Sequence, residues 1–282
     1  MSSSNSKPQP KPSHHKAKGD QGKNNKRKQR RELTREEKIS RALSWALRHR
    51  GPKIGLTMTP DGFVPVAEIM ACREPKLHQH GITLRDLQEI VQSNDKQRYH
   101  MDWMPLENYP NLKTTAPEDT INHDKSTILC IRASQGHSLS FIDANLLLTP
   151  IPPEQLMQIP VIVHGTYRVP WETAIRTQGL NKMTRNHIHF ASGLPQDGVI
   201  SGMRRTSEIY IYIHAAKCAT KDDILFYQSA NGVILTAGID GCLPVEYFSH
   251  VIDAKGNILL DQREQEDSAL TTTTTITDGV TK

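Results

Sequence analysis

Residues 164–191, HGTYRVPWETAIRTQGLNKMTRNHIHFA, constrain the fold of this chain more than any other stretch. The preceding apolar run VIVHG (161–165) predicts a buried strand that ends in a turn. WETAIRTQG (171–179) predicts a short helix closed by Gly179, because glycine is the usual residue just after a helix. HIHFA (187–191) alternates polar and apolar residues, as a strand with one buried face does. A cleft between these elements would gather their polar side chains.

Those side chains have several interpretations. The cleft candidates are His164, Arg185, His187 and His189, at strand ends or on strand faces. One alternative is that the histidines are hydrogen-bonded structural residues of two core strands. Another is a zinc site, since strand alternation puts His187 and His189 on one face beside His164 or His137. No acidic or cysteine partner follows at ligand spacing, so we expect no metal.

The positive charge of the chain is concentrated at its N-terminus. Residues 1–31 hold ten Lys or Arg against one Asp, whereas 32–251 hold 22 basic and 23 acidic residues. The tail is nearly free of apolar residues, so we expect 1–31 to be a disordered basic tail. It would add RNA affinity, act as a nuclear signal, or only aid solubility. Any anion site in the rest of the chain must therefore be local.

Several protein classes are disfavoured by the sequence. No run of 18 apolar residues occurs, so no transmembrane helix is expected. The polar N-terminus lacks the apolar core of a signal peptide. The four cysteines lie far apart without CxxC spacing, which favours free thiols in a reduced intracellular protein of the nucleus or cytoplasm.

The region 32–110 predicts a helical module followed by short strands. Thr34 and Glu37 form a capping box at the start of a helix that ends at Gly51-Pro52. Its last turn carries Arg48, His49 and Arg50, which either complement the helix dipole or reach into a site. This helix is followed by a turn at 61–62, a short strand and a second helix from Val66. An amphipathic helix over 82–94 and a strand at 96–101 come next.

This order of elements is typical of a winged-helix-like module. Lys96, Arg98 and Tyr99 would suit an RNA backbone and a stacked base, or form a solvated strand edge. Residues 111–126 are polar and proline-containing, so we expect a linker there.

The region 127–251 predicts a β-rich second domain, which makes the fold class α+β. ILCI (128–131) is a buried strand, and Arg132 directly after it would bind a phosphate or form a surface salt bridge. A glycine-rich loop covers 191–205, a strand covers 208–216, and Asn231-Gly232 predicts a hairpin turn. From 252 to 282 the chain is polar, and we expect a disordered tail.

The chemistry-bearing residues favour phosphate binding. No GxGxxG, P-loop, GxSxG or HExxH motif is present. Arginines and histidines at strand and helix ends occur without paired carboxylates, and guanidinium groups match phosphate oxygens bidentately. These residues are Arg48, His49, Arg132, His164 and Arg185.

The chain resembles the RNA 2′-phosphotransferase family of the Tpt1/KptA type, and its longer tails are more similar to the animal members. The resemblance covers roughly 39–248 in the family's order. The matching segments are ISRALSWALRH, DGFVPVAEI, NDKQRYHM, IRASQGHS, HGTYRVPWETAIRTQGLNKMTRNHIHFA and FYQSANGVILTAGIDGCLPVEYF.

The resemblance implies an N-terminal winged-helix RNA lobe and a C-terminal ADP-ribosyltransferase-like NAD lobe. It implies an NAD-dependent enzyme that removes the splice-junction 2′-phosphate from tRNA, with NAD as co-substrate. We also expect no metal and a monomeric state. The RNA 2′-phosphate would attack the nicotinamide ribose and release nicotinamide. The adjacent ribose hydroxyl would then attack that phosphate, giving 2′-OH RNA and ADP-ribose 1″,2″-cyclic phosphate.

The resemblance also implies three sets of site residues. The implied catalytic residues are Arg48, His49, Arg132 and Arg185. The implied NAD-binding residues are His164, Gly165, Thr166, Gly179, Leu180, Ser229, Asn231 and Gly232. The RNA-binding candidates are Lys96, Arg98, Gln135, His137 and Ser138.

Two positions depart from the family pattern. His214 stands where the family usually has Asp, and Arg50 where it usually has a small residue. The first puts a peripheral adenosine or loop contact in doubt. Two other functions stay open: an ADP-ribosyltransferase acting on other nucleic-acid phosphates or on protein, and a non-catalytic RNA- and nucleotide-binding protein.

Overall fold

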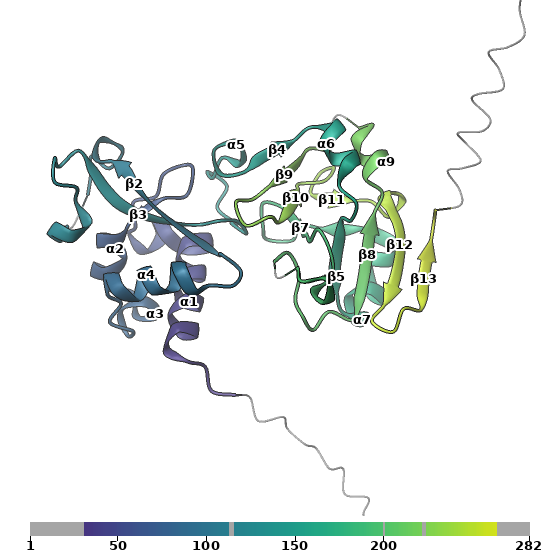
Figure 1. Ribbon diagram of the computed structural model, residues 1–282, viewed down its shortest axis with the longest axis horizontal. Coiled ribbons are helices and arrows are strands. Elements are labelled where there is room, and N and C mark those ends of the chain that lie inside the picture. Colours follow the sequence, from purple (N-terminus) through teal and green to yellow (C-terminus); the bar gives the residue numbers. More distant parts are fainter. Residues whose placement is uncertain (1–30, 113–115, 200, 222–223, 264–282) are drawn as a thin grey trace, which may run out of the picture. The chain divides into compact units, whose positions relative to one another are not determined.

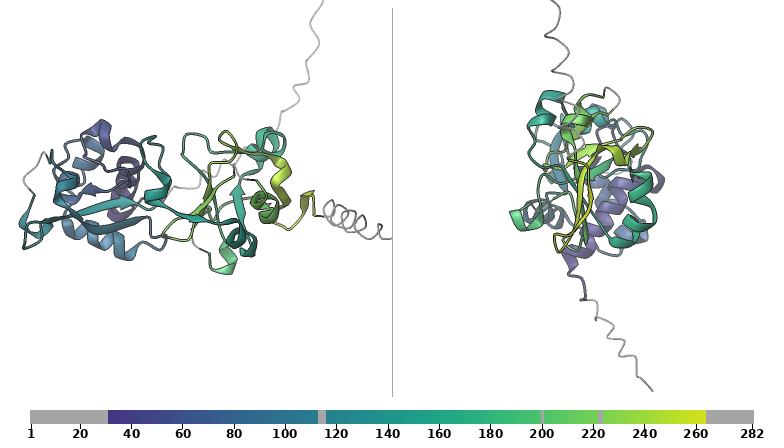
Figure 2. Two further views of the ribbon diagram at one scale, coloured as in Figure 1. Left: turned by 90° about the horizontal axis from the view of Figure 1, so that it is seen from above. Right: turned by 90° about the vertical axis from the view of Figure 1, so that its right-hand side faces the viewer.

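The computed structural model describes residues 31–112, 116–199, 201–221 and 224–263 (Figures 1 and 2). By its contacts the chain divides into Met1–Leu33 and Thr34–Lys282, and the elements below belong to the second unit. The expected basic tail lies outside the described residues except for its last residue, and so does 264–282.

The first helix forms where its capping signal predicts. The Thr34 side chain accepts from the Glu37 amide and Glu37 returns a bond to the Thr34 amide, so α1 (Arg35–Trp45) begins with the expected capping box. The helix continues as a π-helical turn, η1 (Ala46–Arg50), and a 3₁₀ turn, η2 (Gly51–Ile54). Wider turns of this kind often occur at functional sites.

Three further helices and a small sheet complete this part of the chain. The helices are α2 (Val66–Ala71), α3 (Pro75–His78) and α4 (Leu84–Ser93). The strands are β1 (Val64–Pro65), β2 (Tyr99–Pro105) and β3 (Thr127–Ala133), antiparallel in the order β1-β3-β2. Short 3₁₀ turns, η3 (Leu106–Asn108) and η4 (Glu118–Thr120), lie between β2 and β3.

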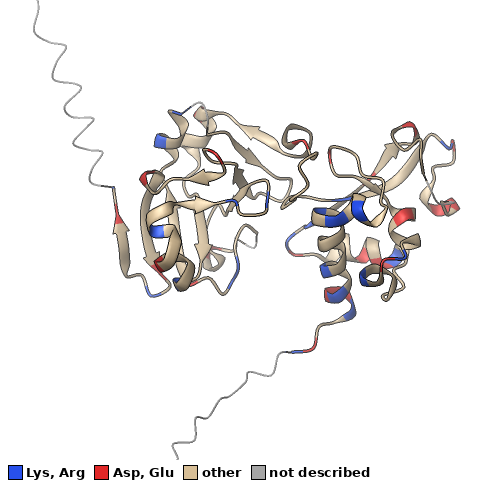
Figure 3. Ribbon diagram, turned by 180° about the vertical axis from the view of Figure 1, so that it is seen from behind, with Lys and Arg blue, Asp and Glu red and all other residues tan. Residues whose placement is uncertain are grey.

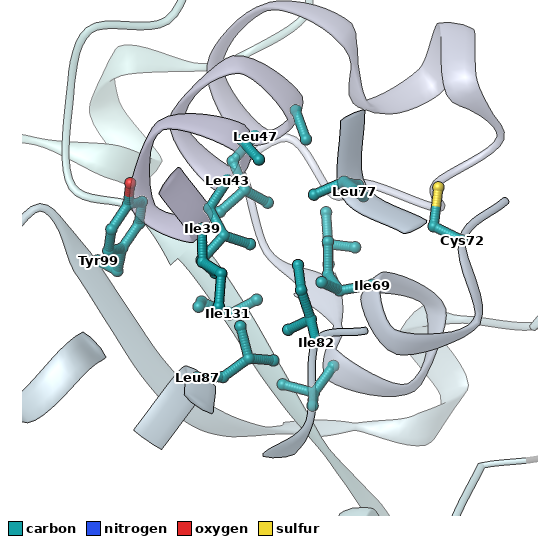
Figure 4. Packing of buried hydrophobic residues seen from close by; sticks show 14 of the residues in the cluster. Ile39, Leu43, Leu47, Ile69, Cys72, Leu77, Ile82, Leu87, Tyr99 and Ile131 are labelled. Carbon is teal, nitrogen blue, oxygen red and sulfur yellow. The ribbon is translucent and has the colours of Figure 1, made fainter. Parts of the chain in front are cut away.

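Strand β3 is buried on both faces, which explains its unbroken apolar run. Leu129 and Ile131 pack into the helical core with Leu43 and Leu47 of the first helix, while Cys130 packs on the other face with Phe63 and Tyr109. Figure 4 shows Ile39, Leu43 and Leu47 in one row facing this core. Fully burying one such leucine or isoleucine contributes about 1.5–3 kcal/mol.

The expected linker at 111–126 is wrong as a domain boundary. Because β3 is the central strand between β1 and β2, this segment connects two neighbouring strands of one sheet. Arg132 is consequently part of the first sheet instead of the second domain.

The rest of the chain forms small antiparallel sheets. The first has the order β4-β9-β10-β7 and the second β13-β12-β8-β5, and β11 pairs with β6. The strands are β4 (Thr149–Ile151), β5 (Val163–Thr166), β6 (Leu180–Asn181), β7 (Ile188–Phe190), β8 (Ile209–Ile213), β9 (Phe226–Gln228), β10 (Ile234–Thr236), β11 (Cys242–Leu243), β12 (Phe248–Asp253) and β13 (Ile258–Asp261). The helical segments are α5 (Ala144–Leu147), α6 (Pro153–Gln158), α7 (Arg168–Pro170), η5 (Trp171–Ile175), α8 (Arg176–Gln178), η6 (Pro195–Asp197), α9 (Ala215–Ala219) and η7 (Val245–Tyr247).

The two four-stranded sheets share one hydrophobic core. Phe190 and Phe226 from the first sheet pack in the same cluster as Ile211, Phe248 and Val251 from the second. The architecture is thus mixed α and β with several small antiparallel sheets, in agreement with the α+β expectation. Among the described residues, no helix combines the length and hydropathy needed to cross a membrane.

Local signals from the sequence correspond well to this region, with two corrections. The hairpin at Asn231-Gly232 joins β9 to β10 as expected, and the helix over 168–178 ends at Gly179, whose φ is 86°. His164, Gly165 and Thr166 lie within β5 instead of in a turn after it. The expected tail from 252 is also wrong in its first part, because Ile258–Asp261 pairs with β12.

Candidate active site

A polar pocket of about 330 Å³ gathers cationic side chains from segments far apart in the sequence. Within the described parts of the chain, its lining contains five Lys or Arg residues and no carboxylate. The lining residues are Arg48, Lys96, Arg98, Gln135, His164, Gly165, Thr166, Tyr167, Arg185, His189, Ser201, Gly202, Met203, Arg204 and Asn231. Such a set repels itself unless an anion is bound, since like charges at short range destabilise each other.

Arg48 is the most deeply placed cation of the pocket. Its carbonyl accepts from the Ser138 amide at 2.9 Å, which fixes the η1 turn against the 134–138 loop. The Nε and Nη2 atoms are buried without a hydrogen-bond partner. The pKa of Arg48 is lowered to about 10, mainly by burial. The charges of Arg185 and Arg98 lower it further, whereas Tyr99 opposes the shift. Buried donors without partners destabilise the free protein and favour a bound acceptor.

Arg185 and Arg204 bring two further charges. Arg185 reaches solvent, and partial burial followed by the charge of Arg204 lowers its pKa. The Arg204 guanidinium lies 5.8 Å from the centre of the Tyr167 ring. Tyr167 in turn hydrogen-bonds Thr206 at 2.8 Å.

Two histidines of the pocket, His164 and His189, are joined in a chain of hydrogen bonds that ends at Gln135. His164 Nδ1 lies 2.8 Å from the backbone carbonyl of His189, which can only accept, so Nδ1 is the donor. His189 Nε2 lies 2.7 Å from Gln135 Oε1 and donates to it. Burial lowers the pKa of both rings, with the charge of Arg185 acting in the same direction. Both are therefore neutral at pH 7, and Nε2 of His164 is left as an acceptor.

Glycine at 165 is required by close packing. A Cβ there would lie 2.5 Å from Ser207 Oγ and 3.1 Å from Met203 Cβ. The backbone of β5 can therefore approach the loop over 203–207 only without a side chain. This contact holds Arg204 beside Thr166 and Tyr167, so the glycine shapes the pocket wall.

Lys96 is tied to the second half of the chain by three bonds. Its carbonyl accepts from Asn231 Nδ2 at 2.7 Å and from Ser201 Oγ at 3.3 Å, and its Nζ donates to the Met203 carbonyl at 3.1 Å. The pKa of Lys96 is lowered mainly by burial and further by the positive charges of Arg98 and Arg205. Lys96 thus anchors the pocket wall as well as contributing charge.

His49 lies on the same π-helical turn as Arg48 but does not line the pocket. Its Nδ1 is 2.9 Å from Ser138 Oγ. Burial, followed by the charges of Arg48, Arg185 and Arg50, lowers its pKa. The ring is neutral at pH 7 until an anion arrives to offset those charges.

Arg132 is not brought to the pocket. Its Nη1 donates to the Asp61 carbonyl at 3.2 Å, and its guanidinium lies 4.5 Å from the centre of the Phe63 ring. Burial lowers its pKa, and the charges of Asp61 and Asp102 oppose that effect. Its Nε is buried without a partner, as in Arg48.

Of the candidate RNA-binding residues, Lys96, Arg98 and Gln135 line the pocket, whereas His137 is buried and Ser138 contacts His49. Both ring nitrogens of His137 lack a partner, and burial together with neighbouring cations lowers its pKa to about 3. The His137 carbonyl accepts from the Asn186 amide at 2.8 Å. His137 therefore supports the backbone beside Arg185 and presents no surface to RNA.

Some of the candidate NAD-binding residues line the pocket, and the others contribute to the packing or to a turn. His164, Gly165, Thr166 and Asn231 line the pocket. A Cβ on Gly179 would lie 2.3 Å from the Leu243 carbonyl, and Leu180 is buried in the shared core. Ser229 Oγ donates within the hairpin turn to Asn231 Oδ1, and Gly232 is exposed at the tip of that turn.

The structure adds pocket residues that were not predicted as site residues. These are Tyr167, Ser201, Gly202, Met203 and Arg204, whereas His189 was already a cleft candidate. Gly202 has a φ of 95°, and a Cβ there would lie 2.7 Å from Ala191 Cα, so the loop crosses β7 closely. The pairing of glycine with two arginines in SGMRR was the available signal.

The zinc alternative finds no support in the geometry. No group of three or more His, Cys, Asp or Glu side chains arranged to hold a metal occurs within the described ranges. His189 bonds Gln135, and His187 packs edge-on to Tyr227 with ring centres 5.7 Å apart.

His214, the departure from the family's Asp, caps a helix. Its Nδ1 accepts from the Lys217 amide at 3.1 Å at the start of α9. Asp is a preferred residue at this position, so His214 performs a capping role that Asp would also perform.

The sequence of this chain matches a known protein family. Residues 34–238 match the model of the RNA 2′-phosphotransferase, Tpt1/KptA family. A mouse tRNA 2′-phosphotransferase 1 is 40% identical over 227 residues, which are 80% of each chain. A tRNA 2′-phosphotransferase of Saccharomyces cerevisiae is 33% identical over 79% of this chain and 86% of its own. A Schizosaccharomyces pombe relative named after the same activity is 39% identical over 79% of this chain, and the match spans 53% of that relative.

Proposed function

The chain belongs to the RNA 2′-phosphotransferase, Tpt1/KptA family, and on that premise we propose that it is a transferase that removes an internal 2′-phosphate from RNA. The relatives named tRNA 2′-phosphotransferase favour spliced tRNA as the substrate. We further propose NAD as the co-substrate that accepts the phosphate.

The observation that carries the proposal is the charge of the pocket. Five cationic side chains and no carboxylate face one cavity, and two nitrogens of Arg48 are buried there without a partner. A phosphate monoester carries close to two negative charges at neutral pH. The pyrophosphate of NAD adds more, so a ternary complex would neutralise the pocket without any metal ligand from the protein.

In the proposed reaction the protein binds and orients, and the substrates supply the reacting atoms. The RNA 2′-phosphate attacks the anomeric carbon of the nicotinamide ribose, and nicotinamide leaves with the bond electrons. The neighbouring ribose hydroxyl then loses its proton and attacks the phosphorus, which forms ADP-ribose 1″,2″-cyclic phosphate. The bond from phosphorus to the RNA 2′-oxygen breaks, and that oxygen takes up a proton and leaves as the free 2′-OH. No protein nucleophile is needed. Among the described residues the pocket lining contains no Cys, Asp or Glu, and the hydroxyl of its serine, Ser201, already donates to the Lys96 carbonyl.

We assign roles from the positions of the side chains. Arg48 and Arg185 hold the phosphate and offset charge that develops on it, and one such preorganised donor is worth roughly 3–4 kcal/mol. His49 bonds Ser138 outside the pocket lining, so we assign it a supporting role beside Arg48; it would become a proton donor only when the bound anion raises its pKa. His164 would offer Nε2 as an acceptor to a ribose hydroxyl, and Gly165–Thr166 would line the NAD side.

Arg132 belongs to the catalytic set only by resemblance. Its strand ends two residues before Gln135, which lines the pocket, but Arg132 itself donates to the Asp61 carbonyl. Fold-level roles are proposals of the same kind: residues 34–133 as a winged-helix-like RNA module and the β-rich remainder as an ADP-ribosyltransferase-like NAD module.

The test is an incubation with a short RNA that bears one internal 2′-phosphate, with and without NAD⁺. Loss of the 2′-phosphate that requires NAD⁺, with one nicotinamide released per phosphate, is the expected result. A stable ADP-ribosylated RNA or protein would instead indicate an ADP-ribosyltransferase. Binding of RNA without any turnover would contradict the enzymatic proposal.

A further inference from the structure

A second depression, of about 680 Å³, opens from the candidate active site and follows the first helix. We refer to it as the α1 groove. It shares Lys96, Arg98 and Arg204 with the active-site pocket. Its remaining lining residues are Glu36, Glu37, Ser40, Arg41, Ser44, Ile90, Ser93, Asn94, Asp95 and Arg205.

The helix supplies one continuous face to this groove. Glu37, Arg41, Ser44 and Arg48 are spaced by four, three and four residues, which places them on the same side of α1 and its extension. At 1.5 Å of rise per residue, Arg41 lies about 10 Å along the axis from Arg48. That is the rise of roughly three stacked nucleotides. The groove therefore has the length to hold the nucleotides next to one bound at Arg48.

The groove is lined by charges of both signs. Two of its carboxylates, Glu36 and Glu37, lie at the far end in the first turn of α1, and a third, Asp95, precedes Lys96 in the chain. Five cationic residues of the lining outnumber these three carboxylates. Arg41 and Arg205 form no ion pair within the part of the chain that the structure describes. Figure 3 shows Lys and Arg in blue along this helix. The groove therefore carries an excess of positive charge, which favours an anionic strand.

The groove offers no side chain suited to recognising a nucleic-acid base among its described lining residues. Ser40 and Ser44 both bond to the Tyr99 hydroxyl, at 3.1 and 2.7 Å, so their own hydroxyl groups are already engaged. None of the described residues that line the groove is aromatic, and single-stranded nucleic acid binds bases chiefly by stacking on aromatics. Contact would be limited to phosphates and sugars.

We infer that the α1 groove binds the RNA strand that flanks the 2′-phosphorylated nucleotide, through Arg41 and Arg205, without regard to its sequence. This inference rests on the proposed function, because it assigns RNA to the neighbouring pocket. It explains how a small pocket would select a phosphate inside a chain over a free mononucleotide.

The test compares two substrates with the wild-type chain and an Arg41→Ala/Arg205→Ala variant. One substrate is a dinucleotide with the 2′-phosphate, and the other is a longer RNA with the same phosphate in its interior. We expect the variant to lose about tenfold in kcat/KM on the long RNA and to be unchanged on the dinucleotide. The slope of log(kcat/KM) against log[salt] should become shallower by about 0.7 for each lost phosphate contact.

Matched controls make the outcome decisive. Arg85→Ala removes an exposed arginine of α4 that pairs with Glu89 at 2.7 Å outside the groove, and it should change neither substrate. An equal loss on both substrates, no loss on either, or stronger competition by polyglutamate than by unphosphorylated RNA of similar length would overturn the inference. If wild type acts on neither substrate the proposed function fails, and affinity for the long RNA still tests the groove by fluorescence anisotropy.

Discussion

At the scale of single residues, the sequence points to several residues of the pocket, but the contacts that make these residues necessary are visible only in the structure. The strand over 161–165 is expected to end in a turn at Gly165, yet Gly165 lies inside β5. The reason for glycine there is the approach of Ser207, 42 positions away in the chain, and no local pattern contains that contact. The sequence leaves Arg48 either complementing the helix dipole or reaching into a site, and the family resemblance favours the site. That its Nε and Nη2 are buried without partners among the described residues is visible only in the fold.

The Gly165 contact yields a prediction with a built-in rescue. Gly165→Ala should lower kcat/KM by tenfold or more, because the new methyl group would lie 2.5 Å from Ser207 Oγ and would push the loop that carries Arg204. Ser207→Gly in the same chain removes the two closest atoms and should restore most of the activity. Steady-state kinetics on the three variants measures this. Failure of Ser207→Gly to improve the alanine variant would contradict the steric explanation.

At the scale of elements, short-range signals predicted the structure and long-range pairing did not follow from them. The capping box at Thr34, the helix stop at Gly179 and the hairpin at Asn231-Gly232 each involve residues a few positions apart. The placement of β3 in the first sheet depends on Val64 pairing with Ile131, and polar linker composition gave no information about that. The strand over 258–261 is partly exposed, so it lacked the apolar alternation that identifies buried strands.

The cap of α9 gives a prediction at this scale. His214→Ala removes the acceptor of the Lys217 amide and should cost about 1 kcal/mol of unfolding free energy. His214→Asp keeps an acceptor and should be neutral or stabilising by a few tenths, since a carboxylate also favours the helix N-terminus. Urea unfolding compares the three proteins. A loss in His214→Asp as large as in His214→Ala would contradict the capping role, and neither change should affect kcat/KM by more than about threefold.

For the whole molecule, buried neutral histidines make stability depend on pH. Burial, followed by nearby cations, lowers the pKa of His137 to about 3 and that of His187 to about 4, and the pKa of His189 falls well below its usual range. The unfolded chain binds these protons near pH 6.5 and the folded chain does not. Stability is therefore full above about pH 7 and falls as the pH drops through 6.5 toward the folded values.

The expected size of this effect follows from the shift of one residue. At pH 5, His137 alone should cost about 2 kcal/mol relative to pH 7.5, since one pH unit corresponds to about 1.4 kcal/mol per proton. Thermal unfolding between pH 7.5 and 5 should show Tm falling steadily, with a shallower fall in His137→Gln. A Tm that is constant over this range would show that the histidines are not buried as neutral rings.

The central claim, that a pocket organised around the unpaired Arg48 binds the substrate phosphate, is tested most directly by Arg48→Met. The account predicts a loss of at least about 10²-fold in kcat/KM for 2′-phosphate removal. It also predicts an unchanged or higher Tm, because the variant no longer buries guanidinium nitrogens without partners. Inorganic phosphate should raise the Tm of wild type and not that of the variant. An Arg48→Met protein that keeps its activity, or that is stabilised by phosphate as much as wild type, would contradict it.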